Sequence, residues 1–273
     1  MVNSFLRFHI AVFLLLAWLT GDAWAERTRI NVGGYLFAPY VNVQDDGRYY
    51  GLTLDFITLL NQLQTEYEFQ FVATSVEQRY RAFSLKRFDM MMFENPNWGW
   101  HGTAVQFSPL NVHDGERFIT LRTSKKRQEY FDSLKDKRLI LVKGYHYQFA
   151  NWVSEPDYLT RNFNVQFVNS NRASIDSIIR SRGDIAPITW SYLQNYLLHH
   201  PDARKKLFIS DKWDQEYQHG ILLRDTAALP LTTLSGYIKQ LEQSGKLKKL
   251  LNQYGLVEHY ADFDDDGHKE SHR

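Results

Sequence analysis

Cysteine is absent from this chain of 273 residues, and net charge is almost absent as well. Without cysteine the protein has no disulfide bonds, no thiol nucleophiles and no thiolate metal ligands. The 32 Lys and Arg residues balance 31 Asp and Glu residues, for a net charge of +1 at pH 7. Because nucleic acids and anionic lipids are bound through extended basic surfaces, we expect neither as a partner.

Long apolar runs are also scarce, and the longest lies at the N-terminus. Residues 10–19 are apolar throughout, follow Arg7 and His9, and precede Ala23-Trp24-Ala25. This run has about half of the roughly 20 residues that a membrane-spanning helix needs, which argues against the alternative of a membrane anchor. Small residues at 23 and 25 suit a signal peptidase. We therefore predict a signal peptide over 1–25, cleavage after Ala25 and a periplasmic location.

Short apolar stretches alternate with amphipathic stretches along the rest of the chain, which is the pattern of an α/β protein. Strands are predicted at 29–32, 69–72, 89–93, 117–121, 139–142, 165–168, 185–188, 208–209 and 220–223. Helices are predicted at 52–63, 76–85, 174–180 and 229–254, with another beginning within 147–152. Strand and helix alternate in two successive series, which predicts parallel strand pairing with right-handed crossovers in each.

Several short motifs occur in an order and spacing that resemble the family 3 solute-binding proteins of ABC transporters. The motifs are Phe37-Ala38-Pro39-Tyr40, Tyr50-Gly51-Leu52-Thr53-Leu54-Asp55, Phe107-Ser108-Pro109, Leu134-Lys135-Asp136-Lys137-Arg138, Val142-Lys143-Gly144, Arg182-Gly183-Asp184 and Ser244-Gly245-Lys246-Leu247-Lys248-Lys249-Leu250. No single motif is specific, but together they extend over nearly all of the chain after residue 25.

This resemblance implies the type II periplasmic binding protein fold. Each of two α/β lobes would contain a mostly parallel sheet flanked by helices, and two crossover strands would join the lobes. Ligand would bind between the lobes, which close about a hinge. The first lobe is expected to comprise 26–120 and 210–256, the second 121–209, and the tail 257–273 is expected to be disordered. We expect a monomer that docks on an ABC permease or, alternatively, on a membrane sensor.

The resemblance implies two charged residues that bind the ligand, and both are missing from their expected positions. Amino-acid receptors of this family hold the ligand carboxylate with an arginine, and His101 stands at that position here. They hold the ligand ammonium with an aspartate, and the corresponding strand here ends in Thr189-Trp190. A standard α-amino acid bound in the usual manner is therefore not expected.

Other side chains are candidates to replace these anchors. Aromatic faces stack on planar ligands and attract cations, and Glu94 could meet a cationic group. The candidate ligand-binding residues are Phe37, Tyr40, Glu94, Trp98, Trp100, His101, Tyr145, Tyr147, Thr189 and Trp190. Core packing of the aromatic residues and a solvated Glu94 are the competing interpretations. A cation held by Trp98, Trp100 and Glu94 is favoured over an anion held by His101.

Catalysis and metal binding are not expected. The chain also resembles periplasmic cyclohexadienyl dehydratases, which use a cleft carboxylate as a general acid, but that chemistry would need cations for the substrate carboxylates. The histidines show no zinc-motif spacing, and Asp262 to Gly267 lacks the closing glutamate of a calcium loop. We therefore expect no catalytic residue, no cofactor and no metal.

Overall fold

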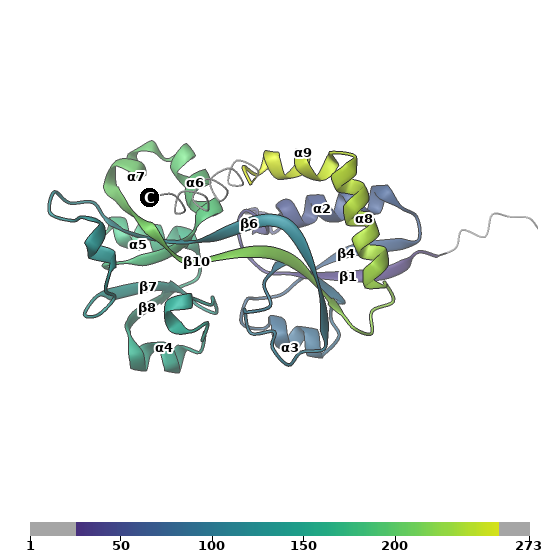
Figure 1. The fold of residues 1–273 in the computed structure, drawn as a ribbon, viewed down its shortest axis with the longest axis horizontal. Coiled ribbons are helices and arrows are strands. Elements are labelled where there is room, and N and C mark those ends of the chain that lie inside the picture. The colour runs from purple at the N-terminus through teal and green to yellow at the C-terminus, as the bar shows by residue number, and fades with distance from the viewer. Residues whose placement is uncertain (1–25, 257–273) are drawn as a thin grey trace, which may run out of the picture.

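The computed structural model describes residues 26–256. Both the predicted signal peptide and the predicted disordered tail lie outside these residues. Six strands form the principal sheet in the order β4-β1-β5-β10-β6-β9, and Figure 1 shows two lobes side by side along the long axis of the molecule. Within the described residues, no helix is both long enough and apolar enough to cross a membrane.

The first lobe is built on three parallel strands, with β1 in the middle. Ile30 of β1 lies opposite Phe69 of β4, and Val32 lies opposite Met90 of β5. β5 is buried at all five of its positions, as expected of a parallel strand that is covered on both faces in βαβ units. The elements are β1 (Thr28–Gly34), the hairpin β2 (Asn42–Val43) and β3 (Tyr49–Tyr50), α2 (Leu52–Leu63), β4 (Tyr67–Ala73), α3 (Arg79–Ser84) and β5 (Met90–Glu94).

The second lobe repeats this arrangement. Strands β7 and β8 pair in parallel, and an isolated bridge between Leu139 and Ile185 joins β7 to the segment before β9. The elements are η1 (Gln128–Phe131), β7 (Arg138–Val142), η2 (Gln148–Ala150), α4 (Pro156–Asn162), β8 (Asn164–Val168), α5 (Asn171–Ile179), β9 (Ala186–Thr189), α6 (Trp190–His199) and α7 (Pro201–Lys206). The helix predicted to begin within 147–152 is a single 3-10 turn, because Asn151 and Trp152 have left-handed backbone angles.

Two long antiparallel strands, β6 (Val105–Leu121) and β10 (Leu207–Arg224), run through both lobes. The sequence predicted only short strands, at 117–121, 208–209 and 220–223. That prediction was wrong in extent because Asp114, Glu116 and Asp214 interrupt the apolar pattern where the strands pass between the lobes. These acidic residues are nevertheless buried.

The C-terminal part of the described chain returns to the first lobe. The sequence predicted one helix over 229–254, whereas the structure has α8 (Leu231–Gln243) and α9 (Lys246–Gln253). Gly245 separates them with a φ of 69°, a left-handed conformation that glycine adopts readily and that ends a helix. Both helices contact α2.

Separate clusters of buried apolar side chains support the two lobes. One large cluster surrounds β1, β4 and β5, and two smaller clusters occupy the second lobe. Phe118 and Ile119 of β6 belong to the smaller clusters. The lobe boundaries predicted at 120/121 and 209/210 stay a prediction, and these contacts favour a boundary on β6 nearer Gly115.

Candidate functional site

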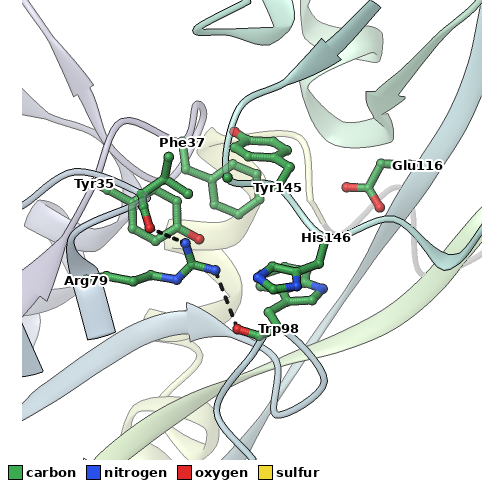
Figure 2. A pocket seen from close by; sticks show the side chains of 9 residues that line it. Tyr35, Phe37, Arg79, Trp98, Glu116, Tyr145 and His146 are labelled. Carbon is green, nitrogen blue, oxygen red and sulfur yellow. Dashed lines mark hydrogen bonds between the residues drawn. The ribbon is translucent and has the colours of Figure 1, made fainter. Parts of the chain in front are cut away.

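A narrow cavity lies between the two lobes, with about 260 Å³ of empty space including open solvent. Figure 2 shows the residues that line it, which come from the loop after β1, from the loop between β4 and α3, from α3, from the loop after β5, from β6 and from the loop after β7. The lining residues are Tyr35, Phe37, Val76, Arg79, Trp98, Glu116, Gly144, Tyr145 and His146. The cavity thus has one basic wall, one acidic wall and aromatic rings between them.

Arg79 forms the basic wall, but its charge is already compensated. The side chain is 1% exposed, and its Nε lies 3.7 Å from Oε1 of the fully buried Glu94. Its guanidinium donates to the carbonyl of Val76 and lies over the ring of Tyr80 at 4.4 Å. Because a buried charge is costly without a partner, this pair holds Arg79 in place rather than leaving it free for an anion.

Glu116 forms the acidic wall, and its carboxyl group forms no ion pair with any of the described residues. Its Oε1 accepts hydrogen bonds from the hydroxyls of Tyr217 at 2.9 Å and Thr189 at 3.4 Å. Its Oε2 is buried and has no hydrogen-bond partner. No Lys, Arg or His of residues 26–256 lies within ion-pair distance of it. Figure 2 shows the carboxylate directed toward the interior of the cavity.

Two further buried carboxylates lie close to Glu116 on the crossover strands. Asp114 accepts hydrogen bonds from the Tyr40 hydroxyl and from the backbone and side chain of Ser191, while Asp214 accepts from the backbone N–H groups of Gln148 and Phe149. Burial, with the charges of both aspartates, raises the pKa of Glu116 well above its ordinary value. Burial also raises the pKa of Asp214 to about 6.

Aromatic rings cover the space between the two charged walls. The rings of Phe37 and Tyr145 meet edge to face at 5.7 Å across the lobes, and Phe37 meets Trp98 at 6.1 Å. Such rings present negative faces and exclude water, which strengthens the attraction between Glu116 and a positive group. The cavity is therefore suited to a cation with an apolar or planar body.

Direct contacts across the cleft hold the lobes together beside the cavity. The Tyr80 hydroxyl and Nε2 of His146 lie 2.8 Å apart, and Nζ of Lys143 lies 3.4 Å from the carboxylate of Glu77. Burial and the nearby Arg79 charge lower the pKa of His146 to about 4. The conformation described here is therefore a closed one.

Three of the ten predicted site residues, Phe37, Trp98 and Tyr145, line this cavity. Tyr40 and Thr189 lie just behind it and bond the acidic cluster, while the Tyr147 hydroxyl accepts from the backbone of Val142.

The remaining predicted residues lie elsewhere. Glu94 accepts a hydrogen bond from Trp100 at 2.7 Å, and both side chains are buried apart from the cavity. The side chain of His101 is exposed, and Trp190 packs over Arg117. None of these four residues lines the cavity, so the cation cage of Trp100 and Glu94 is not what the fold assembles.

Sequence reasoning did not identify Arg79 or Glu116. Arg79 lies on a short helix that reads as an ordinary amphipathic surface segment. One signal for Glu116 was available. It directly precedes the apolar strand predicted at 117–121, and a charged residue at such a position needs an explanation.

The fold and the cleft define a two-lobed ligand-binding protein. The family model of bacterial extracellular solute-binding proteins, family 3, matches residues 30–257, and the chain belongs to this family. It is a solute-binding protein. No curated protein matches it.

Solved structures share its fold at low sequence identity. The ancestral amino-acid-binding protein AncCDT-1, described as a precursor of cyclohexadienyl dehydratase, is 18% identical with a TM-score of 0.65, covering 85% of this chain and 97% of its own. A variant of ArgBP from T. maritima is 18% identical with a TM-score of 0.64, covering 83% and 94%. An ancestral arginine-binding protein bound to arginine is 15% identical with a TM-score of 0.63, covering 84% and 98%. Most of these similar proteins bind ligands rather than transform them.

Proposed function

We propose that this protein captures a small organic cation, an amine or guanidinium compound, between its lobes in the periplasm and delivers it to an ABC permease. The observation that carries the proposal is the Oε2 atom of Glu116, which is buried, has no partner and belongs to the wall of the cavity. A cationic nitrogen would supply both the missing hydrogen bond and the missing positive charge.

The competing ligand class is an anion, and the charges in the cavity disfavour it. Arg79 is paired with Glu94, whereas Glu116 has only neutral donors around it. An anion would have to disrupt a buried ion pair and approach an acidic cluster, and both changes cost free energy. The exposed position of His101 also gives no support to a histidine clamp. Binding of arginine by a protein of the same fold is consistent with a cationic ligand.

The direct experiment is calorimetric titration of wild type and Glu116→Gln with arginine, lysine, agmatine and, as an acidic comparison, glutamate. Glutamine keeps the size of the side chain but removes its charge, so we expect at least tenfold weaker binding of the cations, about 1.4 kcal/mol or more. Glu242→Gln removes an exposed carboxylate of α8 and is the matched control. Equal cation affinity in wild type and Glu116→Gln, or preferential binding of glutamate, would contradict the proposal.

The pH dependence gives an independent test of the same site. A cation binds the ionised form of Glu116, whose pKa in the empty site is raised by burial. Affinity should therefore fall as the pH decreases below that raised pKa, by up to about tenfold per pH unit, with uptake of a proton on release of the ligand. In Glu116→Gln this pH dependence should disappear. A wild-type affinity that is constant from pH 8 to pH 5 would contradict ionisation of Glu116 on binding.

Absence of catalysis is part of this proposal. A buried carboxylic acid with a raised pKa resembles a general acid, and a structural relative is described as a dehydratase precursor. A carboxylated substrate, however, would need a free cation, and Arg79 is paired with Glu94. We expect the bound amine to be recovered unchanged after prolonged incubation, as judged by mass spectrometry.

A further inference from the structure

A second cavity, here called the outer groove, opens beside the first one in the same cleft. It has a volume of about 850 Å³, including open solvent, and shares Phe37 and Tyr145 with the smaller cavity. Its first-lobe wall contains Leu36, Val43 and Tyr50 of the loop and hairpin after β1, and its second-lobe wall is residues 169–172 with Tyr192.

Hydrogen bonds also link the two cavities. Nδ2 of Asn171, at the base of the outer groove, donates to the hydroxyl of Thr189 at 3.0 Å, and that hydroxyl donates to Glu116 at 3.4 Å. The two bonds share one hydroxyl, so Nδ2 of Asn171 lies within about 6.4 Å of Oε1 of Glu116, a separation that two residues of extended peptide, about 7 Å long, can cover. A ligand with its ammonium at Glu116 would therefore reach the outer groove with its second residue.

The lining of the outer groove differs chemically from that of the smaller cavity. It contains no acidic residue, and its one charged side chain, Arg172, is 69% exposed and only 3.9 Å from Asp176 in a weak surface pair. Leu36 and Tyr50 are 52% and 43% exposed and offer an apolar surface, while Asn169 and Asn171 offer amide groups. Because the groove has no carboxylate, a second cationic group such as the far end of a polyamine is not accommodated there.

Resting on the proposed cation site at Glu116, we propose that the outer groove is a second subsite and that the physiological ligand is a short peptide with a free amino end. Its first residue occupies the smaller cavity beside Glu116. The second residue lies on Leu36 and Tyr50, with amide groups near Asn171 and the terminal carboxylate toward Arg172. The carboxyl group of Glu116 in the cavity and the guanidinium of Arg172 in the groove thus match the two ends of one molecule and set its direction.

The test compares arginine and lysine with arginyl-leucine and lysyl-leucine by calorimetry. In wild type we expect each dipeptide to bind about tenfold more tightly than its parent amino acid, since the leucine covers apolar surface in the groove. Tyr50→Ala and Arg172→Ala should each reduce dipeptide affinity about threefold to tenfold and leave amino-acid affinity unchanged. Tyr49→Ala is the matched control, because Tyr49 is 42% exposed on the same hairpin and does not line the groove.

The possible outcomes separate the two proposals. Dipeptides that bind no more tightly than amino acids, or a preference that survives both groove substitutions, would overturn the second subsite and leave the Glu116 site intact. Wild type that binds neither amino acids nor dipeptides would overturn the Glu116 site and the subsite that rests on it. Replacing leucine by leucinamide at the second position should weaken binding in wild type but not in Arg172→Ala, which checks the direction of the ligand.

Discussion

The hydrogen bonds around Asp114 provide a sharp test of how the closed cleft is stabilised. The Tyr40 hydroxyl donates to Oδ2 of Asp114 at 2.9 Å from the first lobe, and Ser191 donates to it from the start of α6 in the second lobe. Tyr40 is 1% exposed and Asp114 is fully buried. Tyr40→Phe removes one donor to a buried carboxylate while keeping the ring, which packs at 4.7 Å on Phe93.

The expected loss follows from the chemistry of this bond. A hydrogen bond to a charged group contributes about 1.5–3 kcal/mol, and a chain of this length loses about 2–4 °C in Tm per kcal/mol. We expect Tyr40→Phe to lower the free energy of unfolding by about 2 kcal/mol in urea titrations and Tm by about 4–8 °C.

A matched control separates the effect of burial on stability from the effect of losing a hydroxyl group alone. Tyr254 makes the same kind of bond to Asp55, at 2.7 Å, on the exposed side of the first lobe. Water replaces an exposed partner, so Tyr254→Phe should cost less than about 1 kcal/mol. Equal losses in the two variants, or an unchanged stability of Tyr40→Phe, would refute the assignment of Asp114 as a buried ionised acceptor between the lobes.

Two further perturbations test the interior away from Glu116. Burial lowers the pKa of His219 to about 3, so protons bind the unfolded chain first and stability falls as the pH decreases from 6.5 toward 3. Between pH 7 and pH 5, unfolding measurements should show His219→Phe gaining about 2 kcal/mol relative to wild type. A methyl group on Gly115 would clash with the carbonyl oxygen of Gln215 on the neighbouring crossover strand. Gly115→Ala should therefore destabilise by about 1–3 kcal/mol in urea titrations, whereas Gly236→Ala, in open space on α8, should stabilise by up to about 1 kcal/mol. The opposite order of these two alanine variants would contradict the close strand packing.

Local patterns along the chain were enough for much of the fold. Short apolar runs predicted β1, β4, β5, β7 and β8, and helical spacing predicted α2, because these elements bury most of their apolar side chains in the cores of the lobes. The same patterns failed where polar residues are buried. Strands β6 and β10 were predicted as fragments, since Asp114, Glu116 and Asp214 look like surface residues to any method that relates polarity to exposure.

The binding site, like the fold, was predictable from the sequence only in part. From the sequence, the resemblance to family 3 proteins predicts that the usual anchors are missing, with His101 and Thr189 at their positions, and that aromatic residues such as Trp98 are available near the cleft. The charges that line the cavity became apparent only in the folded chain. Glu94 is neutralised by Arg79, a residue fifteen positions earlier, whereas Glu116 is left without a cation. Charge compensation is a property of neighbours in space, and sequence spacing does not report it.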